Sequence, residues 1–301
     1  MTNDAVQFSN VAKRFGKVDA LNGLTLAIPK GSVVGLLGRN GAGKTTALRC
    51  LVGLQVPDSG EVRVLGRDPM RLDTEIKQRI GFQSQAGVPF PDATVASLIR
   101  FCAPLYPNWD RELEAQMLSR FGIDPKRRLK QHSQGQQRAV ALLLAICPRP
   151  ELLILDEPAS NLDAVVRREF LDAVLSLAAE EGRTVIFSSH ILSDVERAAD
   201  RIAIVHQGRL LLERSLDDLK EQSRRLRFLF PGSAPEVIEL PGLVARRRSD
   251  REILATVVGY DADATTRLAA SLRADVEAHP LGLEDLFIDL VGREDGVAAS
   301  A

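Results

Sequence analysis

The chain has 301 residues, of which 45% are hydrophobic and 26% charged, a composition typical of a globular protein with a sizeable core. Its formal net charge of −1 gives no global electrostatic basis for binding nucleic acid. The three scattered cysteines form no CxxC pair, which argues against a disulfide framework or a zinc site and suits a reducing cytosol.

The N-terminal segment MTNDAVQFSN has no basic region followed by an apolar stretch, so we expect no signal peptide. The longest apolar run, Ala139–Cys147, is far shorter than the ~20 residues that span a bilayer. We therefore expect a chain that is soluble by itself, although it can still bind a membrane protein.

The first third of the chain reads as strands separated by turns. Alternating or buried apolar patterns predict strands over Ala5–Val11, Leu24–Ile28, Ser32–Gly38 and Glu61–Gly66. Ser32–Gly38 is apolar on both faces, as in a central parallel strand, and a glycine-rich loop and a helical pattern around Ala47–Val52 follow it.

The middle of the chain alternates between helical and strand patterns. Residues 94–147 read as mainly helical, and the segments that follow are a buried strand at Glu151–Pro158, a helix at Arg167–Ala179, a buried strand at Thr184–His190, a helix to about Ala199 and a hairpin at Arg201–Glu213. This alternation predicts an α/β fold with a largely parallel sheet.

The sequence changes character near Gln222, where Pro- and Gly-containing breaks and short strand patterns begin. We therefore expect a first domain over residues 1–220, with a helical subdomain at about 94–147, and a small α+β domain over 221–301. Leu283, Leu286, Phe287 and Leu290 have helical spacing, which predicts an amphipathic helix that docks onto its own domain.

The motif GRNGAGKT fits the pattern G-x-x-x-x-G-K-[ST] and lies between a buried strand and a helix, the context that a phosphate-binding P-loop requires. Its glycines let backbone N–H groups face phosphate oxygens, Lys44 offers a cation to the β- and γ-phosphates, and Thr45 offers a hydroxyl to Mg²⁺. The predicted phosphate-binding residues are Gly38, Arg39, Asn40, Gly41, Ala42, Gly43, Lys44, Thr45 and Thr46.

The segment LLILDE is an apolar strand that ends in two carboxylates, Asp156 and Glu157. Ligands of open α/β sheets bind at the carboxyl ends of the strands, so these side chains are placed for chemistry. Asp156 is a candidate Mg²⁺ ligand, and Glu157 is a candidate to polarise the attacking water.

Taken in this order, the motifs of residues 5–220 resemble the nucleotide-binding subunit of an ATP-binding cassette (ABC) transporter. IGFQSQ, ending at Gln85, is similar to the Q-loop of that family. SNLD, ending at Asp163, is similar to its D-loop, and SSH, ending at His190, to its switch region. Phe15 falls where the family carries an aromatic residue that stacks on adenine.

The resemblance implies the P-loop NTPase fold of that family, with a mainly parallel sheet, an antiparallel β subdomain and a helical subdomain. It also implies ATP and Mg²⁺ as cofactors. Gln85 would contact Mg²⁺ and the water, His190 would contact the γ-phosphate and help to orient Glu157, and Asp163 would communicate across a dimer.

The segment QHSQGQQRA lies where the family has its Leu-Ser-Gly-Gly-Gln signature. Ser133, Gly135 and Gln136 match, whereas His132 and Gln134 depart from the pattern. Ser133 and Gln136 also form a capping box, but a glycine in a first helical turn is destabilising, which suggests that another group approaches the backbone there. In the family that group is the γ-phosphate held by a second subunit, so we expect a homodimer in the ATP-bound state.

The C-terminal segment resembles the accessory segment of ABC-2-type exporters. The transport pathway would be another chain, a permease that docks near Ala86–Thr94, where Val88, Pro89 and Phe90 can form an apolar seat. The subunit would then be cytoplasmic, on the inner face of the cell membrane.

We expect an ATP-hydrolysing subunit that powers a separate transmembrane permease, in the direction of export by resemblance. One alternative is a soluble ABC ATPase that acts on nucleic acid or ribosomes, but such chains typically carry a long coiled-coil insertion or two cassettes. A second alternative is a subunit that binds ATP without hydrolysing it, against which Glu157 and His190 argue.

Overall fold

The computed structural model describes residues 3–160, 162–179 and 182–292. The chain divides into two compact units, Met1–Leu210 and Leu211–Ala301. The division follows Leu210, whereas the sequence composition suggests a boundary at about residue 220. It falls within the strand Arg209–Ser215 rather than in the Pro- and Gly-containing segment. In the described part of the chain, no helix is long and apolar enough to cross a membrane.

The first unit is organised on a six-stranded sheet. In spatial order the strands are β5 (Ile80–Gln83), β6 (Leu152–Leu155), β7 (Thr184–Ser189), β3 (Val33–Leu37), β8 (Arg201–His206) and β9 (Arg209–Ser215). The first five are parallel. Every residue of β6 and β7 is buried, which explains why these strands are continuous apolar runs rather than alternating ones.

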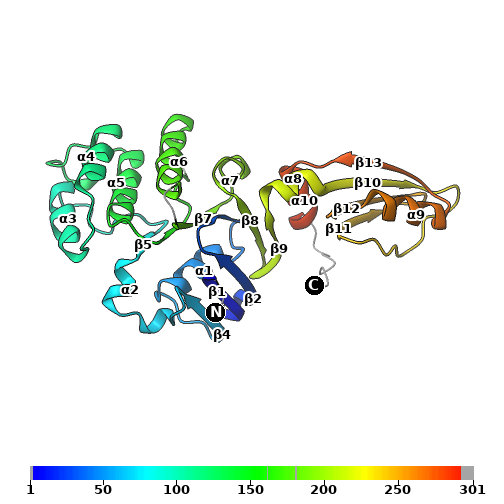
Figure 1. Ribbon diagram of the computed structural model, residues 1–301, viewed down its shortest axis with the longest axis horizontal. Helices are drawn as coiled ribbons and strands as arrows, with labels where there is room; N and C mark the ends of the chain where they lie inside the picture. Colours follow the sequence, from blue (N-terminus) through cyan, green and yellow to red (C-terminus); the bar gives the residue numbers. More distant parts are fainter. Residues whose placement is uncertain (1–2, 161, 180–181, 293–301) are drawn as a thin grey trace. The chain divides into compact units, whose positions relative to one another are not determined.

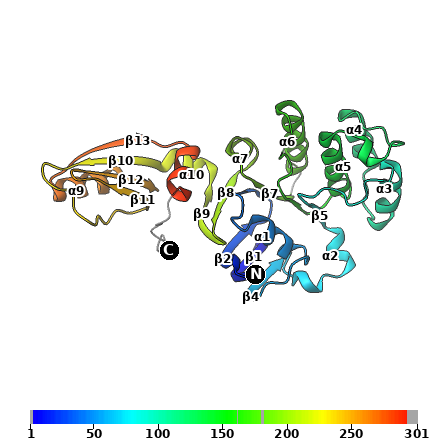
Figure 2. The ribbon, with the colours of Figure 1, turned by 180° about the vertical axis from the view of Figure 1, so that it is seen from behind.

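Two different layers cover the faces of this sheet (Figures 1 and 2). On one face lie α1 (Lys44–Leu51) and a three-stranded antiparallel sheet, in the order β2 (Val18–Pro29), β1 (Asp4–Phe15) and β4 (Ser59–Val64). Together with β3, β6 and β7 these elements share one hydrophobic core. On the other face lie α5 (Gln134–Ile146), α6 (Ala164–Ala178) and α7 (Leu192–Ala198).

A helical region connects β5 to β6 along the chain. It contains α3 (Val95–Cys102), α4 (Arg111–Arg120) and α5, with the short 3₁₀ helices η2 (Ala103–Leu105) and η3 (Leu129–Gln131) between them. These helices lie within the range that the sequence predicts to be helical. The small elements η1 (Pro69–Arg71) and α2 (Thr74–Gln78) precede β5.

The second unit is a small α+β structure, as expected. A four-stranded antiparallel sheet has the order β11 (Leu243–Arg248), β12 (Glu252–Val258), β10 (Ser223–Leu229) and β13 (Asp275–Pro280). One face of that sheet forms a core to which α9 (Ala262–Leu272) contributes Ala269. The unit also contains α8 (Leu216–Gln222) and α10 (Leu283–Val291), and α10 is tied to β10 and β12 because Asp289 accepts hydrogen bonds from Arg225 and Thr256.

Candidate functional site

The P-loop connects the carboxyl end of β3 to the first turn of α1. Two of its glycines are required by close approach of backbone, since a Cβ atom at Gly38 would lie 2.5 Å from the Val205 carbonyl oxygen and one at Gly43 would lie 2.3 Å from that of Ala20. Gly43 also has φ +106°, a left-handed conformation that favours glycine. Any side chain at either position would displace the loop.

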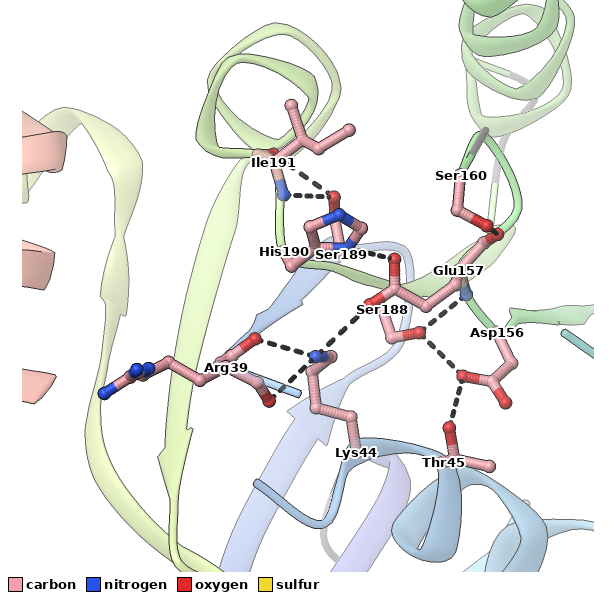
Figure 3. Close-up of polar contacts among 11 residues, drawn as sticks. Arg39, Lys44, Thr45, Asp156, Glu157, Ser160, Ser188, Ser189, His190 and Ile191 are labelled. Atoms are coloured by element: carbon pink, nitrogen blue, oxygen red, sulfur yellow. Dashed lines mark hydrogen bonds and ion pairs between the residues drawn. The ribbon is translucent and has the colours of Figure 1, made fainter. Parts of the chain in front are cut away.

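Lys44 is buried and its ammonium group lies inside this loop. Its Nζ donates to the carbonyl oxygens of Gly38, at 2.7 Å, and Arg39, at 3.4 Å (Figure 3). It also lies 3.2 Å from Oε1 of Glu157. The predicted phosphate-binding cation and the predicted catalytic carboxylate therefore form an ion pair.

Asp156 and Glu157 follow β6, so the two carboxylates lie at the carboxyl edge of the parallel sheet. The hydroxyl of Thr45, in the first turn of α1, donates to Oδ1 of Asp156 at 3.0 Å. The other oxygen, Oδ2, is buried and has no hydrogen-bond partner among the described residues. A buried oxygen of this kind is costly unless a ligand completes it.

Glu157 is held between two basic side chains. Besides Lys44 at Oε1, Nδ1 of His190 contacts Oε2 at 2.8 Å. The side chain of Glu157 is only 7% exposed, whereas that of His190 is 43% exposed. His190 is therefore accessible to solvent, whereas the carboxylate that it contacts is buried.

Ser188 is a member of this network that belongs to the SSH motif but received no role from the sequence. The preceding residues of β7 are apolar except for Thr184, yet Ser188 is fully buried and contacts both residues of the carboxylate pair. A serine directly after the apolar residues Val185–Phe187 of a buried strand was the available signal, because buried hydroxyls need partners.

Two further charged groups lie near the carboxylates. Burial lowers the pKa of Arg138, on α5, and the negative charges of Asp156 and Glu157 act against that shift. Burial also raises the pKa of Asp194, on α7. Arginine stays charged in proteins, so Arg138 is a second cation, in addition to Lys44, that interacts with these carboxylates.

Other predicted residues lie outside this network. Gln85 is exposed in the turn after β5, and its side chain makes no hydrogen bond within the part of the chain that the structure describes. Phe15, at the end of β1, is 48% exposed, and the ammonium of Lys13 lies 5.5 Å from its ring centroid. The remaining P-loop residues Arg39, Asn40, Gly41 and Ala42 form the loop itself, and Thr46 lies in the first turn of α1.

The predicted signature begins α5. The capping box is present: Ser133 Oγ accepts from the Gln136 backbone N–H at 3.2 Å, and Gln136 Oε1 accepts from that of Ser133 at 3.1 Å. A Cβ atom at Gly135 would lie 3.2 Å from Cγ1 of Val166 on α6. Packing against α6 therefore also restricts the space at Gly135, in addition to the phosphate that we expect there.

The two departures from the family signature differ in environment. His132 is buried: its Nδ1 lies 3.1 Å from the Arg128 carbonyl oxygen, whereas its Nε2 has no hydrogen-bond partner among the described residues. Gln134 is exposed. In the D-loop, Asn161 lies outside the described residues, and Asp163 accepts from the backbone N–H groups of Val165 and Val166 at the start of α6.

The arrangement fits a bound Mg²⁺ ion. Thr45 supplies a hydroxyl and Asp156 a buried, unpaired carboxylate oxygen, and both are the hard oxygen ligands that Mg²⁺ prefers. Within residues 3–160, 162–179 and 182–292, no group of three or more His, Cys, Asp and Glu side chains could hold a metal.

Comparison with known proteins identifies relatives over the whole chain. The family model described as ABC transporter matches residues 21–160. Daunorubicin resistance ATP-binding protein DrrA3 of Streptomyces coeruleorubidus is 30% identical, over 100% of both chains. Nod factor export ATP-binding protein I of Burkholderia orbicola is 31% identical, over 96% of this chain and 97% of the relative.

Among solved structures, a dimeric ATP-binding cassette in a post-hydrolysis state with ADP and Pi is similar. It is 25% identical, with a TM-score of 0.62, over 70% of this chain and 98% of that one.

Proposed function

This chain belongs to the ABC transporter family as an ATP-binding subunit, and we propose that Glu157 is the residue through which it hydrolyses ATP to drive a separate membrane permease. The observation that carries this proposal is the network in which Lys44, Asp156 and Glu157 meet at one edge of the sheet. The two whole-chain relatives described above, whose names refer to drug resistance and to Nod factor export, support export as the direction of transport.

Each residue of the network has a role that follows from its position. The P-loop amides and Lys44 would bind the phosphates, and the exposed ring of Phe15 would stack on the base. Glu157 would accept a hydrogen bond from the attacking water, because it is a carboxylate fixed at the edge where the phosphates arrive. His190 would keep that carboxylate oriented and contact the γ-phosphate.

Thr45, Asp156 and Gln85 are the residues that would hold Mg²⁺, which neutralises phosphate charge when it is bound. Lys44 would exchange its contact with Glu157 for contacts with the phosphates, because it is the nearest cation to the loop that binds them. That exchange would free Oε1 of Glu157 to orient water.

The hydrogen bonds of Ser133 and Gln136 lie within the helical region, and Gly135 lies against Val166 of α6. None of these contacts is with the P-loop of the same chain. This supports a head-to-tail homodimer in which α5 of one subunit completes the ATP site of the other, with Asp163 near the dimer contact. A dimeric cassette among the similar structures is consistent with such an assembly.

The permease would dock near Ala86–Thr94, where Phe90 is 58% exposed. Docking there would hold the subunit on the inner face of the cell membrane. The names of the relatives refer to drug resistance and to Nod factor export, which favours this function over an ATPase acting on nucleic acid or ribosomes.

The decisive experiment is Glu157→Gln in the full-length chain, measured by steady-state ATPase activity and by size-exclusion chromatography with ATP. We expect loss of hydrolysis, retained ATP binding and an ATP-dependent dimer. Undiminished hydrolysis would reject Glu157 as the catalytic carboxylate, and a persistent monomer would reject the homodimer.

A further inference from the structure

Ser188 makes two hydrogen bonds that join the carboxylate pair. Its hydroxyl donates to Oδ1 of Asp156 at 2.9 Å and accepts from the backbone N–H of Glu157 at 2.7 Å (Figure 3). The serine is 0% exposed and lies on β7, the strand next to β6, so no water competes for its hydroxyl. One oxygen atom of a neighbouring strand therefore connects the metal-binding candidate to the catalytic candidate.

The hydrogen bond from the Glu157 N–H to Ser188 holds a backbone segment of unusual conformation. Glu157 has φ +47°, a left-handed conformation that residues with a Cβ atom rarely adopt, and Pro158 follows it. The carbonyl oxygen of Glu157 is also held, because it accepts from Oγ of Ser160 at 2.9 Å. Serine hydroxyls thus fix the peptide groups on both sides of the Glu157 Cα, and that orientation aims its side chain at Lys44 and His190.

The same hydroxyl also orients Asp156. Oδ1 of that carboxylate accepts from two hydroxyls, those of Ser188 and Thr45, while Oδ2 has no partner among the described residues. Two donors on one oxygen fix the plane of the carboxylate and leave the other oxygen available to a cation. Loss of one donor would let the carboxylate rotate about its terminal torsion, which is intrinsically broad.

We propose that Ser188 is a positioning residue for ATP hydrolysis, which holds Asp156 and Glu157 in one fixed relative orientation. The proposal rests on the function assigned above to Glu157. Ser188 touches neither substrate nor water, so its loss lowers the turnover number and leaves ATP affinity nearly unchanged. If the hydroxyl had only a structural role, its removal would instead lower stability and activity together. Removal of the hydroxyl of a buried serine elsewhere in the sheet would have that effect.

The test is Ser188→Ala in the full-length chain, with Ser188→Thr as the conservative variant that keeps the hydroxyl. We expect kcat to fall about ten- to a hundredfold in Ser188→Ala, the scale of a small misplacement of catalytic groups, with KM for ATP changed less than about threefold. Ser188→Thr is expected to recover most of that loss. If Ser188→Ala does not fold, Ser188→Cys, which keeps the volume but is a weak donor, replaces it with the same expectation.

The matched control is Ser32→Ala. Ser32 is also buried and donates one hydrogen bond, to the Pro29 carbonyl oxygen, but it precedes β3 at the opposite edge of the same sheet. Wild-type kcat in Ser188→Ala, or an equal loss in Ser188→Ala and Ser32→Ala, would overturn the proposal. Glu157→Gln is assayed in parallel. Normal ATP hydrolysis by Glu157→Gln would reject the proposed function and, with it, the role of Ser188. An inactive Glu157→Gln together with a fully active Ser188→Ala would reject only the role of Ser188.

Discussion

A hydrogen bond of 2.8 Å joins Nδ1 of His190, which follows β7, to Oε2 of Glu157, which follows β6. Because the two strands are adjacent and parallel, residues far apart in the chain are placed side by side at their carboxyl ends. The bond leaves Nε2 of His190 available to a ligand, while the buried carboxylate is kept in one orientation.

His190→Ala is expected to lower kcat about a hundredfold, because it removes the contact that orients Glu157. KM for ATP is expected to change less, because the P-loop amides and Lys44 would still bind the phosphates after the γ-phosphate contact of His190 is lost. Steady-state kinetics measures both constants. The control is His279→Ala, in the second unit, which removes a histidine whose Nε2 lies 3.6 Å from a carboxylate oxygen of Glu277. Equal activity of the two variants would contradict the role of His190.

Ser133→Ala combined with Gly135→Asp is expected to reduce ATPase activity at least tenfold while each chain still binds ATP. The first change removes the hydroxyl at the start of α5, and the second places a negative charge where the partner's phosphate would lie. ATPase assays and ATP-dependent dimerisation in a Glu157→Gln background are the measurements. Ser215→Ala, which removes the serine cap of α8, serves as the control, and unaltered hydrolysis by the double variant would show that the signature is not used.

Phe90→Asp is expected to abolish association with the permease, and hence transport, without affecting ATP binding. An exposed phenyl ring contributes binding energy when it is buried in an interface, and a carboxylate there must be desolvated. Co-purification of the permease and ATP affinity are the two readouts. Val237→Asp, at a similarly exposed apolar residue of the second unit, is the control. Loss of ATP binding in Phe90→Asp would argue against a docking role.

Glu151→Gln is expected to destabilise the fold at neutral pH but not at low pH. Burial by itself raises the pKa of Glu151, but hydrogen bonds from Arg79 and Lys30 outweigh it and hold the pKa below its ordinary value. The stabilisation is therefore complete above the unfolded pKa and is lost as the pH falls through the lower, folded value.

Thermal unfolding at pH 7 and near pH 3 is the measurement for Glu151→Gln, with a difference of about 1 kcal/mol expected at pH 7. Glu61→Gln, from an exposed pair with Arg63, is expected to have almost no effect at either pH. A difference for Glu151→Gln that persists at pH 3 would assign its cause to packing rather than charge.

The sequence was sufficient for five of the six strands of the main sheet and for the P-loop, because buried parallel strands are apolar runs and the P-loop has a fixed spacing. It did not predict β5 or α2, each of which has only four or five residues. A strand as short as Ile80–Gln83 is stabilised by pairing with β6, about seventy residues away in the chain, and such a partner leaves no local pattern.

The family resemblance led us to expect the contact between His190 and Glu157, but the other contacts within the candidate site were not expected. The Lys44–Glu157 ion pair and the two bonds of Ser188 depend on the strand order β6-β7-β3, which no local spacing encodes. The space beside Gly135 likewise depends on a residue that is distant in the sequence, since a Cβ atom there would lie close to a methyl group of Val166 on α6.

The left-handed backbone of Glu157 sets two effects on stability against each other. Glycine would adopt φ +47° without the steric penalty that a Cβ atom incurs, about 1 to 2 kcal/mol, but it would leave the buried ammonium of Lys44 without its carboxylate partner. The charge pair therefore offsets the backbone strain, and this position combines a conformation typical of glycine with a side chain that glycine cannot supply.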